Sequence, residues 1–140
     1  MSVATVLTPL FAQVLLVFVL AVLMGARRRS AIRRGEVQKS ALIGDASAWP
    51  KPARLAANAF HNQFEFPILF YVLTAIVLIT RTADTVFVTL AWLFVGLRCV
   101  HAHIHVTSNR MPHRFFVFIA GLTVLMLMWV RSIYQVLLNG

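Results

Sequence analysis

The sequence predicts an all-α integral membrane protein, a bundle of four transmembrane helices in up-down-up-down order. Hydrophobic residues make up 60% of the 140 residues and charged residues only 12%, a balance too apolar for a soluble core. The first 26 residues carry no charged side chain, and about 20 apolar residues suffice to cross a bilayer. Breaks in the apolar pattern divide the chain, which we take as one domain over residues 1–140, into four segments. The predicted spans are 3–26, 54–80, 84–106 and 112–138.

Most of the positive charge lies in one loop. Of the 13 Lys and Arg residues, eight fall in the segment 27–54, and the net charge is +9. The basic residues follow the first apolar run instead of preceding it, so we interpret that run as a retained span and not as a signal peptide. A basic loop between two spans is typical of the cytoplasmic side, where it also faces anionic lipid headgroups. We therefore expect a bacterial inner-membrane protein with loop 27–53 in the cytoplasm, both termini in the periplasm, membrane lipid as a partner and no nucleic-acid partner.

Polar residues enter the second span at helical spacing. Asn58, His61, Asn62 and Glu65 recur three and four residues apart, which places them on one face of a helix. Such groups are expensive beside hydrocarbon and normally face a bundle interior or a ligand cavity. Pro67 lacks the N–H that would bond the carbonyl four residues back, so we expect it to kink the helix. The segment predicts a polar pocket for a small-molecule ligand at the inner end of the bundle.

The third span carries a second polar face. Arg98, His101 and His105 are three and four residues apart and share one side, while His103 points roughly the other way. Because the turn between the two spans is short, Arg98 and Glu65 should differ in depth by only about 3 Å, at 1.5 Å of rise per residue. Two interpretations stay open: an ion pair that neutralises two charges inside the bundle, or a ligand site built from both faces.

The histidines allow a further interpretation, a metal-dependent membrane enzyme that uses His61, His101 and His105. The last two have the spacing of a helical ligand pair. The carboxylate pattern of di-iron helical bundles is absent, however, and we assign no metal ligands. Cys99 is the only cysteine, which excludes an intramolecular disulfide and a multi-cysteine metal cluster; we expect it to fill apolar space.

The combined pattern resembles the MAPEG family, the membrane-associated proteins in eicosanoid and glutathione metabolism, in its bacterial form. That family has four spans and a basic cytoplasmic loop after the first. Its second helix has an Arg-rich start followed by Asn-x-x-Glu-x-x-Pro, and further arginines lie in the third helix and in the loop that follows it. The matching residues here are Arg54, Asn62, Glu65, Pro67 (one position early), Arg98 and Arg110.

The resemblance implies a homotrimer that binds glutathione, as cosubstrate, between neighbouring subunits near the cytoplasmic face. It implies a glutathione-dependent transferase or peroxidase that acts on lipophilic electrophiles. Glu65 would take the amino group of glutathione, and Arg110 or Arg28 would be catalytic by stabilising the thiolate. The implied glutathione-binding residues are Arg54, Asn58, His61, Asn62, Glu65, Arg98 and His101.

Departures from the family pattern keep a second interpretation open. Asn58 stands where the family has an Arg one turn before its Asn, and Cys99, His101 and His103 stand where its third helix has tyrosines. In the better-known members, that Arg and those tyrosines bind glutathione. The alternative is a catalytically inactive protein of the same fold that binds another small anion or a lipid.

Overall fold

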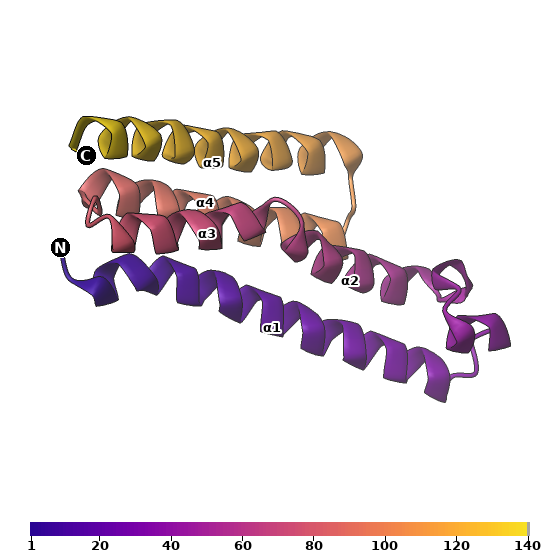
Figure 1. Ribbon diagram of the computed structural model, residues 1–140. Helices are drawn as coiled ribbons and strands as arrows, with labels where there is room; N and C mark the ends of the chain where they lie inside the picture. The colour runs from indigo at the N-terminus through magenta and orange to yellow at the C-terminus, as the bar shows by residue number, and fades with distance from the viewer. Residues whose placement is uncertain (140) are drawn as a thin grey trace.

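A computed structural model describes residues 1–139 and shows four long helical segments side by side (Figure 1). Both ends of the chain lie at one end of the bundle, and the loop between α1 and α2 lies at the other. All four segments are long and apolar enough to cross a membrane. The predicted all-α fold with four spans is thus confirmed. The segments are α1 (Val3–Arg33), α2 (Lys51–His61) followed by α3 (Pro67–Ile79), α4 (Thr85–Val106) and α5 (Met111–Asn139).

Helix α1 continues beyond the predicted end of the first span. Its start is capped by Ser2, whose hydroxyl accepts a hydrogen bond from an N–H of the first turn at 3.2 Å. It ends just before Gly35, which adopts a positive φ of 67° that suits glycine after a helix. Residues 27–33, predicted to be loop, are therefore helical and carry their arginines on a rigid element. The rest of the loop contains two short 3-10 helices, Lys39–Ile43 and Ala46–Ala48.

The helix predicted over residues 54–80 is broken into two. Helix α2 ends at His61, residues Asn62–Phe64 form a 3-10 turn, and α3 begins at Pro67. Glu65 lies in the break with a non-helical backbone, φ −88° and ψ −123°. Proline has no N–H to continue a helical ladder but suits the first turn of a new helix. The predicted kink is confirmed, and it is a full interruption.

A buried pair of amides supports the break from the side of α1. Gln13 of α1 donates from Nε2 to Oε1 of Gln63 at 3.1 Å, and Gln63 donates in turn to the carbonyl of Ala59 at 3.0 Å. Both glutamine side chains are fully buried. Because hydrocarbon offers no water to an unbonded carbonyl, these hydrogen bonds stabilise the break within the membrane.

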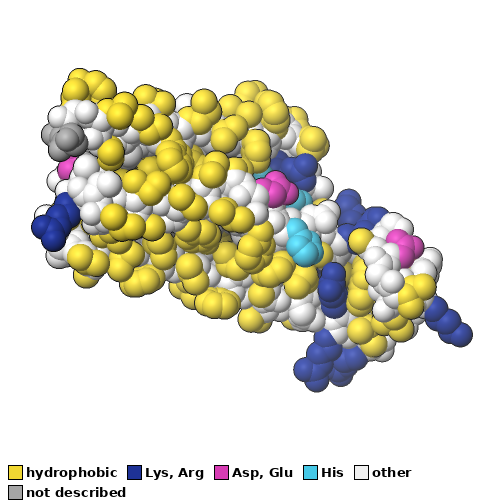
Figure 2. All heavy atoms as spheres, in the orientation of Figure 1, with side chains coloured by type: hydrophobic (Ala, Val, Ile, Leu, Met, Phe, Trp, Pro, Cys, Tyr) yellow, Lys and Arg dark blue, Asp and Glu magenta, His cyan; other side chains and the backbone are white. Residues whose placement is uncertain are grey.

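The larger apolar core lies between the break and the chain termini, and a smaller cluster of Leu20, Ala59 and Ala102 lies on the other side of the break. Many other large apolar side chains point outward, and hydrophobic atoms cover most of the face seen in Figure 2. Most Lys and Arg side chains on that face gather where α1, the loop and α2 meet. An apolar belt with one basic end matches a bilayer and its headgroup layer. The largest fully buried apolar residues are Phe70, Leu73, Phe87, Phe94, Leu125 and Met128.

One carboxylate fastens the end of the bundle opposite the basic loop. Asp84 caps α4 by accepting the N–H of Phe87 at 2.9 Å, and it also accepts a charged hydrogen bond from Arg131 of α5. Arg131 donates further to Gln135 at 2.9 Å. Burial opposes ionisation of Asp84, but the Phe87 N–H and Arg131 outweigh it and lower the pKa below the usual 3.8.

Stability should depend on pH through Asp84. Because the pKa of Asp84 is lowered in the folded state, the stability that its carboxylate contributes is fully present above pH 3.8. This stability is lost as the pH falls through the folded-state pKa. At about pH 6, Asp84→Asn, which keeps the cap, should reduce the free energy of unfolding by about 0.2–1 kcal/mol. The difference should shrink as the pH falls below 3.8 in thermal unfolding of the detergent-solubilised protein. A difference that stays constant with pH would contradict the role of the charge.

Candidate functional site

The break in the second span brings Asn62 against Arg98 of α4. Nη2 of Arg98 donates to Oδ1 of Asn62 at 2.7 Å and to the backbone carbonyl of the same residue at 3.3 Å. The side-chain amide of Asn62 donates in the other direction, to Oε2 of Glu65 at 3.0 Å. Asn62 thus joins a guanidinium to a carboxylate, and we call these three side chains the polar bridge.

The ion pair considered between Glu65 and Arg98 is not formed. No salt bridge joins the two side chains in the part of the chain that the structure describes. Extrapolation along an ideal helix placed Glu65 level with Arg98, but Glu65 lies in the non-helical break and its side chain is exposed. The position next to the guanidinium belongs to Asn62 instead.

Arg98 is a buried cation without a full set of partners. Its side chain is 1% exposed, and its guanidinium carbon lies 4.8 Å from the centre of the Phe66 ring. Nε and Nη1 have no hydrogen-bond partner among residues 1–139. Buried polar groups are nearly always paired, and an uncompensated buried charge is strongly destabilising. Arg98 therefore keeps two buried donor nitrogens that the described residues leave unpaired.

A cavity of about 210 Å³ adjoins the polar bridge at Asn62. His101 and His105 of α4 line it, and both side chains are buried with an Nδ1 atom that has no partner among the described residues. Arg114 of α5 contributes a guanidinium to the wall, whereas Arg98 contacts the wall through Asn62. The rest of the wall is apolar and consists of Met111, Phe115 and Phe118.

The turn between α4 and α5 positions Arg114. Asn109 in this turn adopts a left-handed backbone with φ 47°, which asparagine tolerates better than most residues. Its Oδ1 accepts a hydrogen bond from Nη1 of Arg114 at 2.7 Å, while Nη2 lies 3.0 Å from the sulfur of Met111. A cation is thereby held beside the same cavity as the two histidines.

The polar face predicted for the third span is confirmed. Arg98, His101 and His105 are all buried on the bundle side of α4, and His103 is exposed. Four of the residues expected to bind glutathione therefore come together at the polar bridge and the cavity. They are Asn62, Glu65, Arg98 and His101.

The continuous polar face predicted for the second span is wrong, because α2 ends at His61. Arg54 and Asn58 lie on α2 and line a separate cavity of about 160 Å³ together with Arg28 of α1. The guanidinium carbon of Arg28 lies 5.0 Å from the centre of the Trp49 ring in that cavity. His61 is exposed at the end of α2. The expected single pocket is therefore two cavities, one built on α2 and one beyond the break.

Sequence reasoning overlooked two contributors to this region. Arg114 lies inside α5, whereas Arg110, the predicted catalytic residue, precedes the helix and is exposed. The two arginines are four residues apart, and this helical spacing indicates that either could reach the same site. Gln13 was also overlooked, although no other amide or charged side chain occurs in residues 3–26. An isolated polar group within a span is itself an indication of a buried partner.

The histidines do not converge on a metal centre. Within residues 1–139, no group of three or more His, Cys, Asp or Glu residues is arranged to hold a metal ion. His101 and His105 lie with their ring centres 5.8 Å apart, but His61 is exposed at the end of another helix. The arrangement favours a hydrogen-bonding role for the two buried imidazoles.

The fold and the site together define an integral membrane protein with four helical spans and a polar site within the bundle. A family model of the MAPEG family matches residues 6–134, and the chain belongs to this family. Comparisons with curated proteins and with solved structures gave no match. The resemblance drawn from the sequence is thus confirmed at the level of the family.

Proposed function

We propose that this protein is a glutathione-dependent transferase or peroxidase that acts on lipophilic electrophiles as a homotrimer. The MAPEG family includes glutathione transferases and peroxidases. The observation that carries the proposal is Arg98, a buried guanidinium bonded through one nitrogen only. Its partner Asn62 lines a cavity whose wall also contains Arg114 and two histidines, His101 and His105.

The groups around the cavity fit an anionic peptide. Glutathione carries two carboxylates, an ammonium group and a thiol. Arg98 and Arg114 offer guanidinium donors, which suit carboxylates and thiolates, and the exposed carboxylate of Glu65 suits the ammonium group. The unpaired Nδ1 atoms of His101 and His105 offer two further hydrogen-bonding positions.

Different residues of the site bind glutathione and activate its thiol. Bound glutathione would supply the thiol that attacks an electrophile. Asn62 orients the Glu65 carboxylate by donating to it, while Arg114 stabilises the thiolate, since a nearby cation lowers the pKa of a thiol. We assign this role to Arg114 instead of Arg110 or Arg28, because Arg110 is exposed in the turn and Arg28 lines the other cavity.

The size of the cavity supports assembly into an oligomer. Ligand pockets usually measure about 300–1,000 Å³, whereas this cavity in one subunit measures about 210 Å³. A neighbouring copy supplies the missing wall in the proposed trimer. The exposed apolar side chains of Met111 and Phe115 leave one side open to a lipophilic substrate in the bilayer.

The proposed orientation places the site near the cytoplasmic face of a bacterial inner membrane. The end of the bundle closest to the cavity carries most of the positive charge, and positive loops are retained on the cytoplasmic side. Both termini are then periplasmic, because they lie together at the opposite end.

A catalytically inactive protein that binds a small anion is the second candidate. The cavity wall presents two imidazoles and the guanidinium of Arg114 but no tyrosine hydroxyl. These groups, next to the Arg98–Asn62 contact, would hold a carboxylate without any thiol chemistry. Binding of an anion other than glutathione, with no thiolate formed, would favour this candidate.

Glutathione binding should depend on Glu65. The purified protein in detergent should bind glutathione saturably in calorimetry, and Glu65→Gln should weaken binding by roughly 1.5–3 kcal/mol, the range for a charged hydrogen bond. The substitution should leave folding and assembly intact because Glu65 is exposed. Glu36→Gln is the matched control, since it removes another exposed carboxylate, one that pairs with Arg34 in the loop. A folded Glu65→Gln variant that binds as well as the parent would refute the assigned role.

The two arginines near α5 should differ in their effect on the bound thiol. Arg114→Gln should return the pKa of bound glutathione toward about 8.5, typical of a free thiol, because the cation beside the sulfur is removed. Arg110→Gln should leave that pKa unchanged, because Arg110 is exposed outside the cavity. The ultraviolet absorption of the thiolate, titrated with pH, measures both. An effect of Arg110→Gln alone would contradict the assignment to Arg114.

A further inference from the structure

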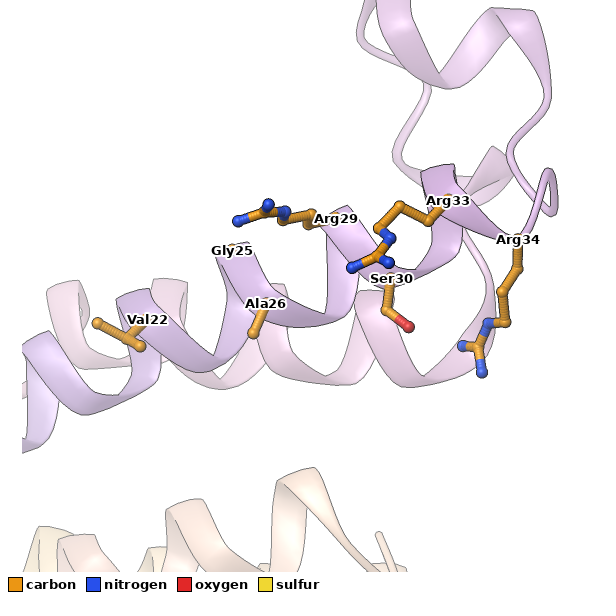
Figure 3. Close-up of a pocket in the computed structure, with 7 residues that line it drawn as sticks. All are labelled: Val22, Gly25, Ala26, Arg29, Ser30, Arg33 and Arg34. Carbon is orange, nitrogen blue, oxygen red and sulfur yellow. The ribbon is translucent and has the colours of Figure 1, made fainter.

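A groove on the outer face of α1 lies outside the proposed site. It is open, measures about 810 Å³, and runs along the basic end of the helix. Small side chains form its floor, an apolar side chain lies at one end, and guanidinium groups line the other (Figure 3). The lining residues are Val22, Gly25, Ala26, Arg29, Ser30, Arg33 and Arg34.

The length of α1 places this groove at the membrane surface. The helix has 31 residues, and at 1.5 Å per residue it is about 46 Å long, compared with about 30 Å for the hydrocarbon core of a bilayer. Its last turns therefore extend into the headgroup layer. The apolar end of the groove at Val22 lies toward the hydrocarbon, and the arginine end lies level with the lipid phosphates.

Two of the arginines near the groove have no partner within the described residues. Arg27 donates to backbone carbonyls of α2 and α4, each at 3.0 Å, and Arg28 lies over an indole ring. Arg34 pairs with a carboxylate at 3.2 Å. Arg29 and Arg33 make no hydrogen bond or ion pair to other side chains or carbonyls in the described structure. Figure 3 shows Arg29 reaching back along the helix above Gly25, with Arg33 folded in the same direction.

Within residues 1–139, no acidic side chain pairs with either of these two arginines. The chain contains only four acidic residues, and each already accepts a hydrogen bond or an ion pair from a neighbour. A second copy of the chain would bring the same four acidic side chains and a further net charge of +9. The acidic residues are Glu36, Asp45, Glu65 and Asp84, with Arg34, Ser47, Asn62 and Arg131 as their respective partners.

We propose that the groove binds one anionic phospholipid, with its phosphate held by Arg29 and Arg33. Guanidinium groups bind phosphate oxygens through charged, often bidentate hydrogen bonds. The upper part of an acyl chain lies over Val22, Gly25 and Ala26, where the absence of large side chains leaves room along the helix. This continuity with the apolar span selects a membrane lipid over a free phosphate ion. The site is independent of the glutathione proposal, because it shares none of that cavity's residues.

Native mass spectrometry of the detergent-purified protein tests the proposal with two lipid probes. Phosphatidylglycerol should be retained in preference to phosphatidylcholine with the same acyl chains. The double variant R29Q/R33Q should bind phosphatidylglycerol about thirtyfold more weakly, the equivalent of about 1 kcal/mol for each arginine near a lipid surface. Arg81→Gln, which removes an exposed arginine at the opposite end of the bundle, is the control and should change nothing.

A variant without a charge change separates a lipid from a free anion. Gly25→Leu should also weaken phosphatidylglycerol retention, since a Cβ at this position meets nothing within 4 Å and the new side chain fills the groove without disturbing the fold. Inorganic phosphate at equal concentration should not displace the lipid. Retention that is equal in the parent and R29Q/R33Q would overturn the proposal, as would displacement by inorganic phosphate. A variant that changes the number of copies in the assembly, with lipid retention unaltered, would instead identify the groove as a contact between copies.

Discussion

The hydrogen bonds from Arg98 to Asn62 depend on a helix that stops. In a continuous helix, the carbonyl of Asn62 would accept the N–H four residues on, and it would not be free for a side chain. The non-helical step at Glu65, just before the new helix begins at Pro67, ends that ladder. The carbonyl of Asn62 instead accepts a hydrogen bond from Arg98, as does its own side-chain oxygen. One interruption thus creates the acceptor pair that holds a guanidinium inside the bundle.

Neighbouring side chains stabilise the break, but they do not provide every hydrogen-bond partner that Arg98 requires. Gln13 donates to Gln63, which donates to the carbonyl of Ala59, and the Phe66 ring covers one face of the Arg98 guanidinium. Two nitrogens of Arg98 are nevertheless unpaired. Structural sites usually complete such networks, whereas binding sites keep free donors for the ligand. The ends of the bundle also differ: Asp84 pairs with Arg131 at one end, whereas Arg29 and Arg33 at the other make no ion pair among the described residues.

The four spans and the bundle follow from hydropathy alone, because a bilayer admits few other arrangements of such apolar segments. The buried face of α4 also follows from sequence, since its helix is regular from end to end. The site could be predicted only in part from the sequence, because helical spacing does not continue across the break before Pro67. Before this residue, Glu65 does not have the helical backbone that the expected ion pair assumed, and Asn58 lines another cavity. Arg114 and Gln13 depend on which helices touch, and the period of one helix does not contain that information.

A double-mutant cycle on the polar bridge tests the central claim most directly, namely that the interruption at Pro67 couples Asn62 to Arg98. The free energy of unfolding would be measured for the parent, Asn62→Ala, Arg98→Met and the double variant in the same detergent. We predict a coupling energy of about 1.5–3 kcal/mol, as expected for a hydrogen bond to a charged group. Effects that add to within about 0.5 kcal/mol would show that the two side chains act independently and would contradict this account.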